Sequence, residues 1–144
     1  MRKNYIKLGD IILIPIDGDR CGIAKIIYLS KYFKDVILLN IYPLIANFSE
    51  KVIELSANIP DELLIYTGNQ KIKTEEWKKL NNVMVTEEEK RLSTRIVGGE
   101  VWIENECIGT ATEQDRKKIN RMGVDGTKLV EDKIKDYLFN KGLL

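Results

Sequence analysis

The sequence predicts an α+β fold for a single domain that spans residues 1–144. Apolar runs of strand length joined by short turns fill residues 1–60, and apolar residues at helical spacing follow near the C-terminus. We therefore expect an N-terminal antiparallel sheet or small, partly open barrel, then a further hairpin, and one or two C-terminal helices packed on the sheet. The chain is 44% apolar and carries only three prolines, so it can bury a core. It shows no internal repeat and no linker.

Three strands open the chain. Residues 10–16 form an apolar run rich in isoleucine, and Asp17-Gly18 predicts a hairpin turn because glycine accepts a positive φ. Residues 21–29 and 35–41 are the next predicted strands, which together make an antiparallel meander. Pro43 marks the end of the third strand or an edge of the sheet.

The middle of the chain has weaker patterns. Residues 46–60 show no clean period and stay unassigned, although residues 51–55 are compatible with a short strand or turn. We expect a strand at residues 62–66, a short helix at 74–80 with Thr74 as its N-cap, and one more short strand at 83–85.

The clearest hairpin lies at residues 92–104, where Gly98-Gly99 forms the turn. Alternation places Val101 on one side of its second strand and Trp102 on the other, and Asn105 turns the chain into a short strand at 107–108.

Helical signals follow at the C-terminus. Thr112, with Asp115 three residues later, is an acidic variant of the capping box. Thr127 precedes a second helix that ends at Gly142. Five apolar residues at helical spacing predict the face that packs on the sheet: Leu129, Val130, Ile134, Tyr137 and Leu138.

The chain contains no histidine, which removes the usual general base and the common zinc ligand. Asp17, Asp19 and Gly22 imitate the start of a calcium loop, but Cys21 and Tyr28 stand where oxygen ligands belong. Gly98-Gly99 lacks the spacing and the lysine of a phosphate loop. We therefore expect no enzymatic activity, no metal and no cofactor, although carboxylates and lysines remain as possible acids and bases.

The two cysteines, Cys21 and Cys107, lack metal or redox spacing and are expected to be small, unbridged, buried side chains. No apolar run has the length of a membrane span or the pattern of a signal peptide, which favours a cytosolic protein without a membrane partner. The chain has 23 basic and 22 acidic residues, so its net charge is too small to attract nucleic acid.

Residues 61–110 carry ten acidic and seven basic groups, a net charge of −3. Acidic segments are commonly solvated faces of a protein, but they also complement the surface of a basic protein partner. Trp102 has a carboxylate two residues away on each side, so it is either an interface anchor or covered by a helix. The candidate partner-binding residues are Glu87, Glu88, Glu89, Glu100, Trp102 and Glu104.

Residues 7–29 also resemble a known family. Lys7-Leu8-Gly9-Asp10-Ile11-Ile12-Leu13-Ile14-Pro15-Ile16, the Asp17-Gly18 turn and Gly22-Ile23-Ala24 are similar to the opening of the immunity protein 26 family of bacterial polymorphic toxin and contact-dependent growth inhibition systems. The family's tyrosine and tryptophan would correspond to Tyr66 and Trp77. The resemblance implies a non-enzymatic cytoplasmic α+β protein that binds and neutralises a cognate toxin, such as a nuclease.

A rival class shares the same first strand. Gly9-Asp10-Ile11 also resembles the opening of growth-inhibiting ribonuclease toxins built on a small SH3-like barrel. That reading, or a nucleic-acid-binding module on the same barrel, requires a basic face that the charge pattern does not predict. A housekeeping interaction module built on the same barrel is a third alternative.

Overall fold

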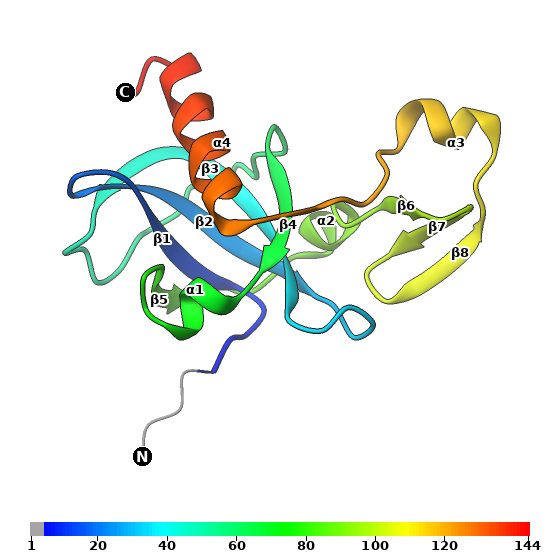
Figure 1. The fold of residues 1–144 in the computed structure, drawn as a ribbon, viewed down its shortest axis with the longest axis horizontal. Coiled ribbons are helices and arrows are strands. Elements are labelled where there is room, and N and C mark those ends of the chain that lie inside the picture. Colours follow the sequence, from blue (N-terminus) through cyan, green and yellow to red (C-terminus); the bar gives the residue numbers. More distant parts are fainter. Residues whose placement is uncertain (1–4) are drawn as a thin grey trace.

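The computed structural model describes residues 5–144, which form two sheets and four helices (Figure 1). The larger sheet has the spatial order β5 (Lys78–Asn82), β1 (Asp10–Asp17), β2 (Arg20–Leu29), β3 (Val36–Asn47), β4 (Leu64–Gly68) and β9 (Val124–Asp125). The smaller sheet consists of β6 (Arg95–Val97), β7 (Glu100–Ile103) and β8 (Glu106–Thr110). The α+β prediction is confirmed, and neither sheet closes into a barrel.

The first three strands form the centre of the larger sheet. β1 and β2 meet through the Asp17-Gly18 turn, and the side chains of Asp17 and Arg20 form an ion pair across it. β3 is longer than predicted because it continues through Pro43. The register between β2 and β3 shifts between Gly22 and Ile23, so Pro43 lies in an irregular stretch where a missing amide hydrogen is tolerated.

The prediction of a helix at residues 74–80 is wrong. The helix there is α1 (Gln70–Lys73), Thr74 is its C-cap, and Glu75 has a left-handed φ of 65°. The chain then adds β5 to the free edge of β1. The prediction of a strand at 83–85 is wrong, because pairing with β1 ends at Asn82 and residues 83–85 have no regular structure. Trp77 is fully buried, and its indole Nε1 donates to Glu131 at 2.9 Å.

The helix α2 (Glu87–Arg91) was not predicted, although its signal is visible in the sequence. Thr86 caps the amide of Glu89, and the Glu89 carboxylate accepts from the amide of Thr86, which is a full capping box. A Thr-x-x-Glu pattern was thus present inside the acidic run.

The predicted hairpin around Gly98-Gly99 is confirmed as β6 and β7, and Asn105 turns the chain into β8 as expected. α3 (Glu113–Lys118) begins with the predicted capping box of Thr112 and Asp115. Figure 1 shows that this part of the chain projects away from the larger sheet. We call residues 95–118 the lobe.

The helix α4 (Thr127–Asn140) covers one face of the larger sheet through Val130, Ile134 and Leu138. Gly22 permits this contact, because a Cβ at this position would lie 2.4 Å from Cγ2 of Ile134. The predicted end at Gly142 is confirmed: its φ is 76°, the left-handed conformation that ends many helices. Of the predicted apolar face, Leu129 is exposed.

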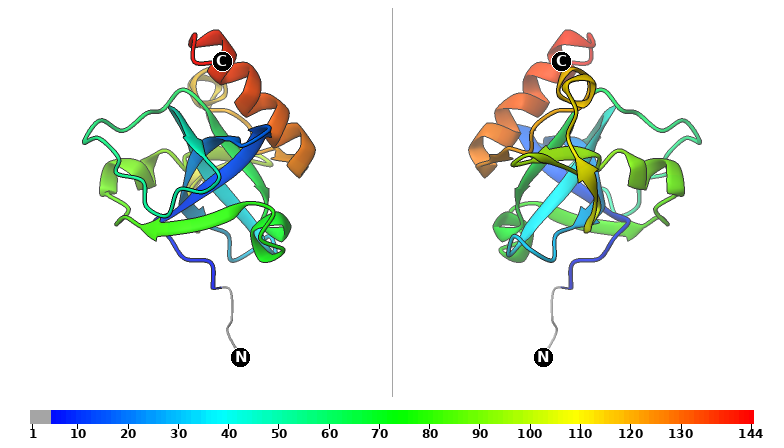
Figure 2. Two further views of the ribbon diagram at one scale, coloured as in Figure 1. Left: turned by 90° about the vertical axis from the view of Figure 1, so that its left-hand side faces the viewer. Right: turned by 90° about the vertical axis from the view of Figure 1, so that its right-hand side faces the viewer.

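The opposite face of the larger sheet has its own apolar cluster, and Figure 2 shows the segment 48–63 and α4 on opposite sides of the sheet. Ile53 and Leu55 of that segment pack on this cluster. The segment has no regular strand or helix, which answers the open question about residues 51–55. Within residues 5–144, no helix is long and apolar enough to cross a membrane.

Candidate functional site

The predicted partner-binding residues fall into two groups. Glu100 and Trp102 lie on β7, and Glu104 lies in the turn that follows it, with a left-handed φ of 53°. Glu87 and Glu88 are exposed on α2. Glu89 is 1% exposed, so its assignment to the contact surface is wrong. The capping box turns its side chain back towards the helix start, where it pairs with a buried lysine.

Trp102 is half-buried against the larger sheet rather than beneath a helix. Its ring meets that of Tyr32 edge to face, with centroids 5.5 Å apart and planes at 69°. Tyr32 lies in the turn between β2 and β3 and is 65% exposed. We call Tyr32, Glu100, Trp102 and Glu104 the Trp102 surface.

The edge strand β8 is exposed along its whole length. Cys107 lies on it, which contradicts the expectation of a buried thiol, and its Sγ lies 3.0 Å from Oε2 of Glu100. That hydrogen bond raises the pKa of Cys107. Cys21 is buried as expected, and burial raises its pKa to about 11. Both thiols are free.

Arg95 joins the lobe to the larger sheet and is only 3% exposed. Its Nη1 donates to the carbonyl oxygens of Ser93 at 3.1 Å and Glu104 at 2.7 Å, and its Nη2 donates to the Tyr28 hydroxyl at 3.1 Å. The guanidinium lies 4.7 Å from the ring centroid of Tyr28 and 5.7 Å from that of Tyr66. Within the described part of the chain, no carboxylate lies within 4.0 Å of it, and its buried Nε has no partner.

The Tyr28 hydroxyl extends this junction to the next turn. It donates to Oδ1 of Asn105 at 2.7 Å, and the same oxygen accepts from the amide of Lys31 at 3.1 Å. Tyr66, whose hydroxyl donates to the carbonyl of Ser93, has its pKa raised to about 12 because burial outweighs the charge of Arg95. Aromatic rings and carbonyl oxygens therefore surround the cation.

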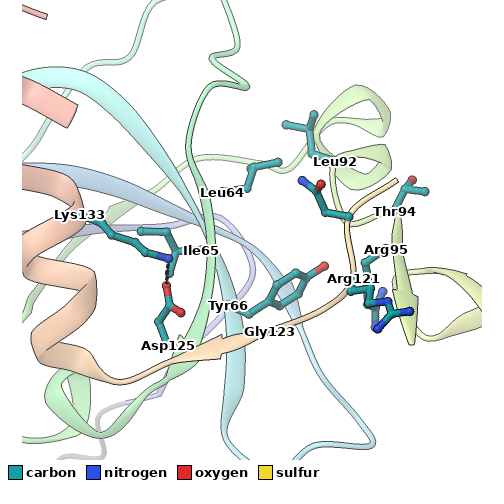
Figure 3. A pocket seen from close by; sticks show the side chains of 11 residues that line it. Leu64, Ile65, Tyr66, Leu92, Thr94, Arg95, Arg121, Gly123, Asp125 and Lys133 are labelled. Atoms are coloured by element: carbon teal, nitrogen blue, oxygen red, sulfur yellow. Dashed lines mark hydrogen bonds and ion pairs between the residues drawn. The ribbon is translucent and has the colours of Figure 1, made fainter. Parts of the chain in front are cut away.

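A cleft of about 420 Å³ opens beside this junction, between β4, β9, α4 and the segment that leads into β6 (Figure 3). Figure 3 places Arg95 and Arg121 on one wall and Asp125 and Lys133 on the other. Lys133 pairs with Asp125 at 2.6 Å. The remaining lining residues are Leu64, Ile65, Tyr66, Leu92, Thr94, Asn120 and Gly123.

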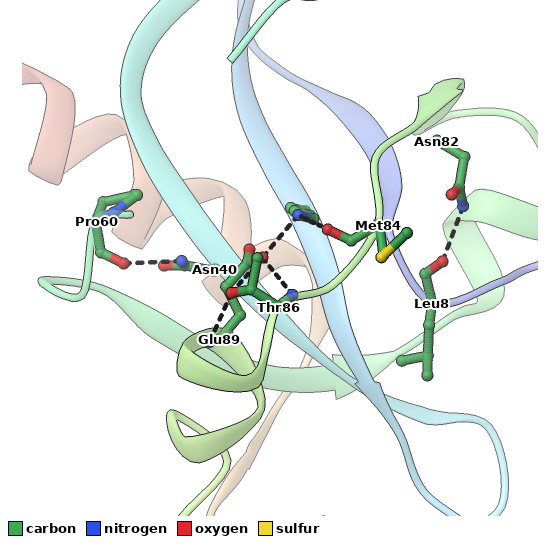
Figure 4. A network of polar contacts seen from close by, with 8 residues as sticks. Leu8, Asn40, Pro60, Asn82, Met84, Thr86 and Glu89 are labelled. Carbon is green, nitrogen blue, oxygen red and sulfur yellow. Dashed lines mark hydrogen bonds and ion pairs between the residues drawn. The ribbon is translucent and has the colours of Figure 1, made fainter. Parts of the chain in front are cut away.

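A second buried cation lies at the centre of the larger sheet (Figure 4). Lys25 donates to Oε1 of Glu89 and to the carbonyl of Met84, both at 2.9 Å. Asn40, opposite Lys25 on β3, donates to the carbonyl of Pro60 at 2.8 Å. Burial, and secondarily the charge of Glu89, raises the pKa of Tyr42 to about 12.

Residues 5–144 contain no group of three or more cysteine, aspartate or glutamate side chains arranged to hold a metal. Comparisons with protein-family models, with curated proteins and with solved structures found no match for this chain. The local geometry therefore carries the functional argument.

The sequence alone did not identify the cationic residues of the cleft. Arg95, Arg121 and Lys133 are 12 to 38 positions apart, and no motif links them. The only visible signal was Arg95 itself, an arginine within the predicted first strand of the hairpin at residues 92–104. Its aromatic partners, Tyr28 and Tyr66, come from other strands.

Proposed function

We propose that this protein is an immunity protein that binds a cognate bacterial toxin in the cytosol and neutralises it without catalysing a reaction. The observation that carries the proposal is the Trp102 surface, where a half-buried tryptophan meets the exposed ring of Tyr32, with Glu100 and Glu104 two residues before and after the tryptophan in the chain. The resemblance of residues 7–29 to immunity proteins supplies the kind of partner.

Two physical properties make this surface suitable for a protein partner. Partly exposed tryptophan and tyrosine anchor interfaces because they bury a large area with few rotatable bonds. Carboxylates around such an anchor attract a basic partner, and a nuclease toxin is basic where it holds nucleic acid. The exposed strand β8 adds an edge on which a partner strand can pair.

The first experiment is co-expression with the toxin candidate encoded beside this gene, with cell growth and co-purification as readouts. We expect the wild-type protein to restore growth and Trp102→Ala to weaken toxin binding by about 30-fold or more, as loss of an interface anchor does. Phe139→Ala is the matched control, because Phe139 is a 67% exposed aromatic residue on α4. Equal affinity of the two variants would remove Trp102 from the interface.

Charge reversal tests the carboxylates separately. The double variant Glu100→Lys and Glu104→Lys should slow association and weaken its dependence on salt, whereas Glu54→Lys, at an exposed site on the segment 48–63, should not. Glu89 must stay unchanged in this series because its substitution would break a buried ion pair. A failure of every neighbouring toxin candidate to bind would overturn the proposal, as would sustained cleavage of RNA by the pure protein.

A further inference from the structure

The cleft beside Arg95 contains a buried charge that the described protein leaves uncompensated. A guanidinium removed from water costs several kcal/mol unless an anion or a full set of acceptors replaces the lost hydration. Only 3% of the Arg95 surface is exposed. The residue makes no ion pair with any carboxylate in residues 5–144, and its Nε has no hydrogen-bond partner. The two tyrosine rings compensate only part of this cost.

A second arginine lines the same cleft in a fixed position. The backbone on either side of Arg121 is tied to β6, since the Ile96 amide donates to the carbonyl of Asn120 and the Met122 amide donates to that of Ile96, both at 2.9 Å. Its side chain is exposed, and among the described residues it has no hydrogen-bond or ion-pair partner. Arg121 is therefore held at the cleft with its guanidinium free.

The charges of the cleft define the ligand class. Arg95, Arg121 and Lys133 are three cations, and Asp125 is the single carboxylate, already paired with Lys133. The difference is an excess of two positive charges. A phosphate monoester carries about −1.5 to −2 charges at neutral pH, whereas a single carboxylate carries only one.

We propose that this cleft binds a small phosphate monoester of about the size of a mononucleotide. The phosphate contacts Arg121, whose free planar guanidinium group suits bidentate contact with an oxyanion. Arg95 attracts the same phosphate through its charge, because its Nη atoms already donate to protein acceptors and its Nε is buried. Thr94 and Asn120 offer hydroxyl and amide groups for the polar part of the organic moiety, and Leu64 and Leu92 offer apolar contact. The volume of about 420 Å³ falls within the usual range of small-molecule sites.

The test uses the full chain with four probes: inorganic phosphate, adenosine 5′-monophosphate, adenosine and a short single-stranded RNA. Affinity is measured by calorimetry, and thermal unfolding reports stabilisation by each probe. We expect inorganic phosphate and the monophosphate to bind and to raise the melting temperature, and adenosine to do neither. Absence of binding by both phosphate probes would overturn the proposal. So would tighter, Arg121-dependent binding of the RNA, which would assign the cleft to a nucleic-acid strand.

Arg121→Gln is the decisive variant because the exposed side chain makes no hydrogen bond or ion pair with the described residues, so its loss should leave folding intact. We expect phosphate affinity to fall by about 10- to 100-fold, as when a charged hydrogen bond is lost. Arg116→Gln is the matched control, since Arg116 is an exposed arginine on α3 that does not line the cleft. Equal phosphate affinity of the two variants would place the anion elsewhere.

Arg95→Met provides a second measurement on the buried wall. It removes the positive charge and keeps an apolar side chain beside the tyrosine rings, so phosphate affinity should fall while circular dichroism confirms that the chain still folds. Toxin neutralisation by Arg121→Gln should equal that of the wild type, because Arg121 does not belong to the Trp102 surface. Failure of phosphate binding and failure of toxin binding are thus separate results.

Discussion

Two buried cations in this protein have opposite surroundings. Lys25, at the centre of the larger sheet, has a carboxylate partner in Glu89 and a carbonyl partner in Met84. Arg95, at the junction of the two sheets, has carbonyl oxygens and aromatic rings around it, but no carboxylate among residues 5–144 lies within 4.0 Å. Lys25 is enclosed by protein, whereas Arg95 lines an open cleft.

The two cations therefore differ in whether the protein itself supplies a counter-charge. The Lys25–Glu89 pair brings opposite charges together and fixes α2 against β2, although Oε2 of Glu89 is buried without a hydrogen-bond partner. Arg95 holds the lobe in place but keeps part of its charge uncompensated. Two residues of nearly equal burial thus differ in charge compensation, because Lys25 pairs with Glu89 and Arg95 pairs with no carboxylate among residues 5–144.

The largest expected effect comes from breaking the enclosed pair. Glu89→Ala leaves the ammonium group of Lys25 buried without its carboxylate, and we expect the free energy of unfolding to fall by about 3–5 kcal/mol, measured by urea denaturation. The adjacent Glu88→Ala is the control, because Glu88 is exposed and should change stability by less than about 0.5 kcal/mol.

The double variant Lys25→Met and Glu89→Leu shows whether the loss arises from the unpaired charge. Replacing both partners by apolar side chains of similar size should restore most of the lost stability. If the double variant were as unstable as Glu89→Ala, the capping role of Glu89 at Thr86 would matter more than its pairing with Lys25.

Arg95→Met should have a smaller and more local effect. The variant loses the bonds to the carbonyls of Ser93 and Glu104 but also removes a buried charge without a carboxylate, so we expect a loss of about 1–2 kcal/mol. Hydrogen exchange should accelerate in residues 95–110 and stay slow in β1, β2 and β3. Uniform acceleration across both sheets would show that Arg95 supports the whole fold.

The pH dependence of stability tests a third buried group, the thiol of Cys21, which lies on the same strand as Lys25. Burial raises the pKa of Cys21 from 9.0 to about 11, so between these values the thiol ionises in the unfolded chain but not in the folded one. Stability should therefore fall as pH rises from about 9 to 11, by about 1.4 kcal/mol per pH unit. Urea denaturation at pH 7, 9 and 10 measures the slope, and Cys21→Ala should reduce it. An unchanged slope in Cys21→Ala would assign it to the tyrosines.

Local signals predicted the parts of the fold that local physics decides. The Asp17-Gly18 and Gly98-Gly99 turns and the Thr112 capping box form where the sequence places them. Residues 78–82 become a strand because the edge of β1 pairs with them, and their own sequence has no strand pattern.

The candidate sites depend on long-range packing and were less predictable. Trp102 could be singled out from its neighbours, but its contact with Tyr32 comes from a turn 70 positions away in the chain. Glu89 looked like its neighbours Glu87 and Glu88, and only its position three residues after Thr86, that of a capping box, sets it apart. Arg95 meets its tyrosines only once β2, β4 and β6 are assembled.

The two ends of the lobe lie together, because the amide of Ile96 in β6 bonds to the carbonyl of Asn120, two residues after the lobe ends, at 2.9 Å. The lobe is therefore an insert whose two ends are joined to each other by backbone hydrogen bonds. Mutations in the loop tips of the lobe can accumulate without disturbing the register of β1 to β4. The proposed Trp102 surface can thereby change while the larger sheet stays constant.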